Sequence, residues 1–132
     1  MAHETQVRVR YEETDQMGVV YHAKYLHYFE MGRTEALRDA GLRYRDLEDA
    51  GLMLTVTEVG VRYHASARYD DLLTIRSRVT GLGKARIRFD YEIFDEGRLL
   101  VTGHTVLASI DRDGRPKRLP VDVAKLAEGM RR

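Results

Sequence analysis

The sequence predicts an α+β fold in which an antiparallel sheet packs on one long helix. Between residues 24 and 40, apolar residues recur at steps of three and four, which is the period of an amphipathic helix. An alternating segment precedes this helix, and strand-like segments separated by turn-forming residues fill the chain from residue 53 to residue 110. A strand, a helix and then several strands in that order is an α+β arrangement.

The first predicted strand lies near the N-terminus. Val7, Val9 and Tyr11 alternate with charged residues, so one face of this segment is apolar and the other is polar. Tyr11 is therefore expected at the end of a strand, directly before a polar loop.

The long helix predicted over residues 24–40 carries an apolar stripe. The stripe consists of Tyr25, Phe29, Gly32, Ala36 and Ala40, and it is widened by Leu26 and Leu37. Gly32 costs about 1 kcal/mol relative to alanine in the middle of a helix, so we expect it to allow a close approach to the sheet. Gly41 occupies the position of a C-terminal helix cap, and a shorter helix over residues 44–50 ends in the same way at Gly51.

The remaining elements are mainly strands. They are predicted over residues 53–63, 72–79, 84–93 and 99–110, with a short C-terminal helix opening at Pro120. Glycines at 81–83 and the sequence Asp-Glu-Gly at 95–97 indicate turns. The last strand is apolar on both faces, which is typical of a central strand.

Composition limits the classes of function. The 132 residues are expected to form a single domain, residues 1–132, with a net charge of +1 that does not select nucleic acid. The chain has no cysteine, which excludes disulfides, thiolate metal sites and a cysteine nucleophile. It has neither a hydrophobic signal core nor a run long enough to span a membrane, so we expect a cytoplasmic protein without stable membrane insertion.

The segment between the first strand and the long helix is the best candidate for chemistry. Asp15 and Gly18 lie in a polar loop, and His22 follows just before the helix. Short loops between rigid elements commonly present reactive groups. Asp15 can act as a general base that activates water or as a nucleophile, and the alternative is that it only shapes a turn.

Residues 14–25, TDQMGVVYHAKY, resemble the signature of the 4-hydroxybenzoyl-CoA thioesterase family. They are most similar to the small bacterial acyl-CoA thioesterases found with the Tol–Pal envelope system. Residues 69–71 and 114–120 match later landmarks of the family in the right order, so the resemblance spans roughly residues 6–120. It implies a hotdog fold, in which an antiparallel sheet wraps around one long helix, and hydrolysis of an acyl-CoA thioester without a separate cofactor.

The resemblance also implies roles for individual residues. Asp15 would be the base or nucleophile, the backbone amide of His22 the donor nearest the thioester carbonyl, and Tyr11 a neighbour of Asp15. Lys84 and Arg118 match positions that contact the nucleotide of coenzyme A. The His22 side chain could protonate the leaving thiolate, orient Asp15 or only start the helix, and Tyr11 could equally be an ordinary core residue.

The sequence also bears on metal binding, on other possible functions and on assembly. The histidines lack metal-ligand spacing, so no metal site is expected. Two other functions stay open: a hotdog acyl-CoA dehydratase or hydratase, and a non-catalytic acyl-CoA-binding module. Because hotdog subunits pair through their sheet edges, we expect a homodimer or homotetramer.

Overall fold

The structure is a computed structural model, and it describes residues 2–129. Within these residues, five antiparallel strands form a sheet in the order β1-β3-β4-β5-β2. The strands are β1 (His3–Arg8), β2 (Met53–Tyr63), β3 (Leu72–Leu82), β4 (Arg86–Asp95) and β5 (Arg98–Ile110). The helices are the short 3₁₀ turn η1 (Tyr11–Glu13), α1 (Lys24–Asp39), α2 (Tyr44–Asp49) and α3 (Val121–Gly129).

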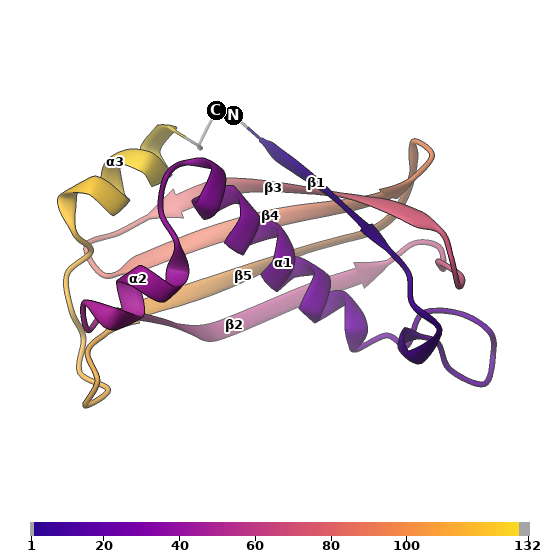
Figure 1. The fold of residues 1–132 in the computed structure, drawn as a ribbon, viewed down its shortest axis with the longest axis horizontal. Helices are drawn as coiled ribbons and strands as arrows, with labels where there is room; N and C mark the ends of the chain where they lie inside the picture. Colours follow the sequence, from indigo (N-terminus) through magenta and orange to yellow (C-terminus); the bar gives the residue numbers. More distant parts are fainter. Residues whose placement is uncertain (1, 130–132) are drawn as a thin grey trace.

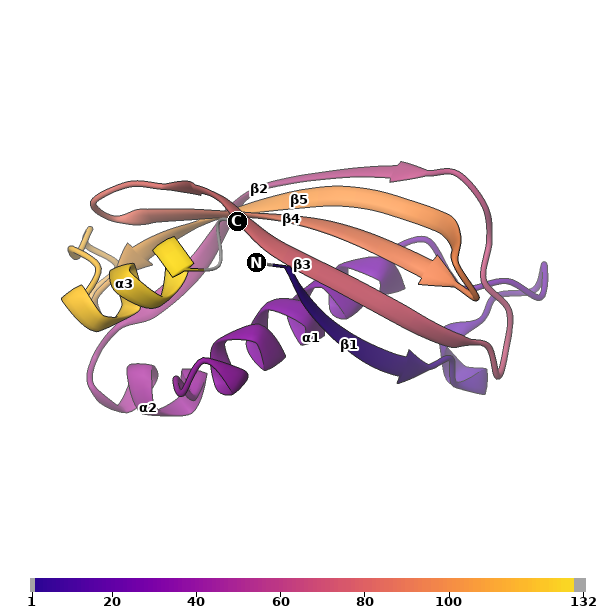
Figure 2. The ribbon, with the colours of Figure 1, turned by 90° about the horizontal axis from the view of Figure 1, so that it is seen from above.

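Helix α1 runs across one face of the sheet, and the opposite face carries no helix of the described residues (Figures 1 and 2). The loop between η1 and α1 lies at one end of the sheet, and α2 and α3 lie at the other (Figure 1). The predicted α+β class is therefore confirmed. None of the helices within residues 2–129 is long and apolar enough to cross a membrane.

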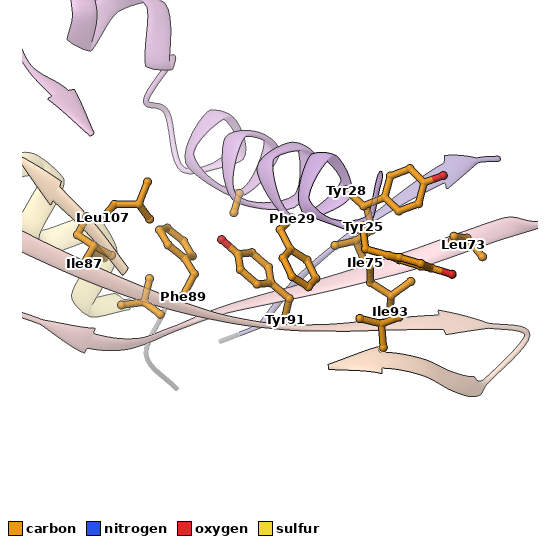
Figure 3. Close-up of a cluster of buried hydrophobic side chains, with 14 of the residues drawn as sticks. Tyr25, Tyr28, Phe29, Leu73, Ile75, Ile87, Phe89, Tyr91, Ile93 and Leu107 are labelled. Carbon is orange, nitrogen blue, oxygen red and sulfur yellow. The ribbon is translucent and has the colours of Figure 1, made fainter. Parts of the chain in front are cut away.

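The apolar stripe of α1 faces the sheet as predicted. Its buried residues are Tyr25, Tyr28, Phe29, Gly32, Ala36 and Leu37. Phe29 stacks on Tyr91 of β4 with ring centroids 4.4 Å apart (Figure 3). The prediction for Leu26 is wrong, because this residue is 37% exposed.

Gly32 brings α1 close to the sheet, which confirms the expectation from its position in the helix. A Cβ atom at this residue would lie 2.5 Å from Ser77 Oγ and 2.8 Å from Ile75 Cγ2. Both distances are shorter than a normal van der Waals contact. The helix backbone therefore rests directly on β3, which fixes the position of α1 and of the loop that leads into it.

The sheet confirms most predicted strands and corrects one turn. Ile87, Phe89, Tyr91 and Ile93 on β4 are all buried, as their alternation predicted. The turn predicted at residues 81–83 is wrong in its first two residues, because β3 continues through Leu82 after a register shift. The predicted turn at 95–97 is confirmed: Glu96 and Gly97 both have positive φ, 50° and 81°, as a type I′ hairpin requires.

The first strand differs from its prediction at both ends. It begins at His3 and ends at Arg8, so Tyr11 lies outside it. The Glu13 side chain accepts a hydrogen bond from the Arg10 N–H at 2.8 Å, which turns the chain into η1 before Tyr11 can extend the strand. The prediction that Tyr11 ends a strand is therefore wrong.

Candidate active site

The segment between η1 and α1 folds back on itself. Thr14 and Val20 form an antiparallel bridge, and the Asp15 N–H donates to the carbonyl of Val19 at 2.9 Å. At the tip, the Gly18 N–H donates to the carbonyl of Asp15 at 2.9 Å. The φ of Gly18 is +79°, a value that glycine adopts easily, and this allows the chain to turn there.

Asp15 lies beside a hollow of about 300 Å³ at this end of the sheet. The hollow is lined by Asp15, Met17, Val19, Val20, His22, Tyr25, Tyr63, His64, Ala65 and Ser66. Oδ1 of Asp15 accepts a hydrogen bond from the Met17 N–H at 2.9 Å. In the described residues nothing bonds to Oδ2, so this oxygen is free to accept a proton or to attack a carbonyl.

His22 supplies a backbone amide at the same hollow. Across residues 2–129 its N–H has no hydrogen-bond acceptor, whereas the neighbouring N–H groups of Tyr21 and Lys24 are bonded to the carbonyls of Glu13 and Tyr21. The free N–H comes just before a helix of 16 residues, where the helix dipole adds partial positive charge. An amide in this position can stabilise a developing negative charge.

The His22 imidazole is exposed and packs against aromatic rings. Its ring centroid lies 4.5 Å from that of Tyr21 and 6.4 Å from that of Tyr63. No hydrogen bond of the described residues links the imidazole to Asp15. The orientation of Asp15 thus comes from the Met17 amide, and the imidazole is left free in this structure.

Two tyrosines from outside the loop also line the hollow. Tyr25 comes from α1, and its hydroxyl accepts a hydrogen bond from the Ala67 N–H at 3.3 Å. Tyr63 comes from the end of β2, and its hydroxyl donates to the carbonyl of His22 at 2.9 Å. Burial raises the pKa of Tyr25, against a lowering effect of the Ala67 amide, and burial also raises the pKa of Tyr63. Both phenols therefore stay protonated at neutral pH.

A further tyrosine holds the turn in front of the loop. The buried Tyr28 donates a hydrogen bond to Glu13 Oε1 at 3.0 Å, and the same oxygen binds the Arg10 N–H. Burial, and then the hydrogen bond to Glu13, raise the pKa of Tyr28. This connection ties η1 to α1 and so fixes both ends of the segment that carries Asp15.

Tyr11 lies apart from the hollow. Its side chain is 78% exposed and makes an edge contact with Tyr69, with ring centroids 5.7 Å apart. Its carbonyl accepts hydrogen bonds from the N–H and the hydroxyl of Thr14. The structure therefore connects Tyr11 to the Asp15 loop through its backbone.

Lys84 and Arg118 do come together, as neighbours in a second hollow of about 410 Å³ that Lys125 also lines. The carbonyl of Lys84 accepts a hydrogen bond from the Leu119 N–H at 2.8 Å. This hollow lies between the end of β3 and α3, at the opposite end of the sheet from Asp15 (Figure 1). The 11 residues of β3 separate the two ends, a span of roughly 35 Å.

The lining of the Asp15 hollow includes residues that the sequence did not reveal. They are Tyr63, which ends β2, and the next three residues, His64, Ala65 and Ser66, all more than 40 residues after Asp15. His64 bonds to Thr102 at 3.0 Å and is thereby oriented. Among the described residues, no three His, Asp or Glu side chains are placed to hold a metal ion.

The sequence of this chain is similar to those of known thioesterases. The family model of the thioesterase-like superfamily matches residues 9–127. The acyl-CoA thioesterase YbgC of Haemophilus influenzae is 38% identical over 106 residues, which cover 80% of this chain and 78% of that protein.

Two solved structures are similar over nearly the whole chain. A hypothetical protein from Thermus thermophilus has a TM-score of 0.94 and 35% identity, and the match covers 100% of this chain and 99% of that one. A probable thioesterase from Bartonella henselae has a TM-score of 0.87 and 38% identity, and the match covers 91% of this chain and 100% of that one.

Proposed function

The chain belongs to the thioesterase-like superfamily, has the predicted hotdog fold and is a thioester hydrolase, and we propose that it hydrolyses acyl-CoA thioesters at the Asp15 hollow. The products would be a free acid and coenzyme A. The 38% identity to an acyl-CoA thioesterase supports this substrate class. The more specific resemblance, to the 4-hydroxybenzoyl-CoA thioesterase family and to the thioesterases found with the Tol–Pal system, stays a prediction.

One observation carries the proposal: two residues that line the same hollow carry a carboxylate oxygen and an amide hydrogen without a partner in the described residues. They are Asp15, with Oδ2, and His22, with its N–H. Hydrolysis of a thioester needs both functions, because water or a carboxylate must attack the carbonyl and its oxygen then becomes negatively charged.

The steps follow from these two groups. The thioester oxygen accepts a hydrogen bond from the His22 N–H, which polarises the carbonyl. Asp15 then takes a proton from an attacking water, or attacks the carbon itself to give a mixed anhydride that water cleaves later. In either case the tetrahedral intermediate collapses by breaking the carbon–sulfur bond, and the thiolate of coenzyme A leaves.

The first experiment replaces Asp15 with asparagine. Asp15→Asn keeps the oxygen that binds the Met17 amide and removes the charge, so kcat should fall by about 10²–10⁴ while folding stays unchanged. Asp111→Asn is the matched control, because Asp111 Oδ1 accepts hydrogen bonds from the N–H groups of Asp113 and Arg115 in a turn far from the hollow. Near-parental kcat for Asp15→Asn would refute the assignment.

Isotope labelling separates the two mechanisms. After a single turnover in heavy-oxygen water, a nucleophilic Asp15 can retain label in its carboxylate, because water can attack the anhydride at the Asp15 carbon. A general base transfers all of the label to the released acid. Mass spectrometry of the Asp15 peptide distinguishes these outcomes.

We also propose a homodimer or homotetramer, because β2 is an unprotected sheet edge. Val56, Val59 and Tyr63 on this strand are 42–49% exposed. Near the start of this edge, the Tyr44 hydroxyl bonds to both the N–H and the carbonyl of Leu54. Exposed edges of this kind favour pairing with another strand. A stable monomer by light scattering at micromolar concentration would contradict the proposal.

Assembly also bears on coenzyme A recognition. Lys84 and Arg118 lie roughly 35 Å along the sheet from the Asp15 end of their own subunit. We therefore propose that they bind the phosphates of a substrate held by a neighbouring subunit. Mixed oligomers of Asp15→Asn and Lys84→Ala subunits test this: regained activity supports a shared site, and activity that only equals the sum of the separate variants contradicts it.

A further inference from the structure

The carbonyl of His22 has an unusual partner for a residue at the start of a helix. The N–H of Leu26, four residues further on, donates instead to the carbonyl of Ala23 at 3.2 Å. The bond to the His22 carbonyl comes from the Tyr63 hydroxyl at 2.9 Å, and Tyr63 lies 41 residues away on β2. A side chain from the sheet thus completes the backbone hydrogen bonding at this point.

Contacts with two aromatic rings orient the Tyr63 side chain, and its hydroxyl stays protonated. The ring makes edge contacts with Tyr25, at a centroid distance of 5.6 Å, and with the imidazole of His22, at 6.4 Å. Burial raises the pKa of the phenol, which keeps its proton available for the His22 carbonyl. The hydroxyl is therefore a fixed donor at the wall of the Asp15 hollow.

The other backbone groups of this segment are bonded locally. The Tyr21 N–H donates to the Glu13 carbonyl at 2.9 Å, and the Lys24 N–H donates to the Tyr21 carbonyl at 2.8 Å. In the described residues, His22 receives its backbone bond from Tyr63 and its N–H is left free. That N–H lies in the same peptide plane as the Tyr21 carbonyl, which the Lys24 N–H holds. The bond from Tyr63 holds the next plane through the His22 carbonyl, so it restrains rotation of the two planes about the Cα of His22.

We propose that Tyr63 is a positioning residue for hydrolysis: by holding the His22 carbonyl, it keeps the His22 N–H directed at the thioester oxygen. This inference rests on the proposed function of the Asp15 hollow. A donor that is already oriented needs no rearrangement when negative charge develops on that oxygen, which is the condition for strong stabilisation of a transition state. Tyr63 touches neither the attacking water nor the leaving thiolate in this scheme, and it acts through the backbone of His22.

The test compares two tyrosine-to-phenylalanine variants. Tyr63→Phe removes only the hydroxyl and keeps the ring contacts. Its kcat should fall about three- to tenfold, the effect of losing one neutral hydrogen bond, with little change in KM. Tyr44→Phe is the matched control, since its hydroxyl also bonds to a backbone carbonyl at 3.2 Å, but at the other end of β2. Its kcat should match the parent.

A spectroscopic measurement removes dependence on turnover. In the Asp15→Asn background, an acyl-CoA with a ¹³C-labelled carbonyl is bound and its infrared stretch recorded. Adding Tyr63→Phe should move this stretch back toward its frequency in water, and adding Tyr44→Phe should leave it unchanged. Circular dichroism verifies that each variant is folded.

The outcomes distinguish this inference from the proposed function. Parental kcat and an unchanged carbonyl stretch in Tyr63→Phe would overturn the role of Tyr63, even with Asp15→Asn inactive. An equal loss of kcat in Tyr44→Phe would also overturn it, because the effect would then arise from β2 as a whole. Full activity of Asp15→Asn would instead refute the proposed function itself.

Discussion

Replacing Gly32 with alanine tests how closely α1 must lie on the sheet. Alanine favours the helix by about 1 kcal/mol relative to glycine. The added Cβ would lie 2.5 Å from Ser77 Oγ and 2.8 Å from Ile75 Cγ2. Overpacking of a core by one methyl group typically costs about 1–3 kcal/mol. We expect the contacts to dominate, so Gly32→Ala should lower the free energy of unfolding by up to about 2 kcal/mol.

The two contacts differ in how easily they yield. Ser77 Oγ is buried and has no hydrogen-bond partner among the described residues, so its hydroxyl can rotate away at small cost. Ile75 is fully buried and β-branched, which leaves its Cγ2 few alternative positions. Most of the cost should therefore come from the contact with Ile75.

A double-mutant cycle measures this directly. Ile75→Ala removes the obstructing methyl group and alone should cost about 2–5 kcal/mol. In that background Gly32→Ala should become neutral or stabilising by up to about 1 kcal/mol, a coupling of about 2 kcal/mol. Urea unfolding at a fixed protein concentration gives the four free energies. Equal destabilisation by Gly32→Ala in both backgrounds would refute the close-contact explanation.

Three further predictions concern other parts of the chain. Glu13→Ala should lower the free energy of unfolding in urea by about 1–3 kcal/mol, because the buried Tyr28 hydroxyl loses its acceptor. Glu13→Gln keeps an acceptor oxygen and should lower it less. Equal losses in the two variants would contradict this explanation. Lys84→Ala should raise KM for acyl-CoA more than for a truncated pantetheine thioester, and high salt should shrink the difference. Burial, with Asp71 and Glu96 nearby, raises the pKa of Asp95 in the folded protein, so its ionisation opposes folding as pH rises. Asp95→Asn should therefore raise the urea midpoint at pH 7 but not at pH 3, and an equal rise at both values would exclude a charge effect.

Periodicity was sufficient to predict the elements that depend on local sequence. The bounds of β2 agree with the predicted segment, and α1 begins at the predicted Lys24. The turn at Gly18 also follows from the residue itself, because few other residues adopt a φ of +79°. Periodicity failed where a side chain accepted a hydrogen bond from the backbone and redirected it. The Glu13 carboxylate accepts from the Arg10 N–H, and the first strand ends before Tyr11.

The candidate site was predictable only in part, for a reason of topology. Asp15 and His22 belong to one short segment, so a local motif could place them together. Tyr63 reaches the same hollow because β2 runs back to this end of α1, which no pattern within the loop encodes.

The strand direction that brings Tyr63 to the Asp15 hollow also separates this hollow from Lys84. β2 ends at the Asp15 hollow, whereas β3 starts near that end and carries the chain away along the full sheet. Residues that serve one substrate can therefore lie at opposite ends of one subunit. If Lys84 contacts the coenzyme A of a substrate held by a neighbouring subunit, loss of assembly should raise KM as much as loss of Lys84 itself.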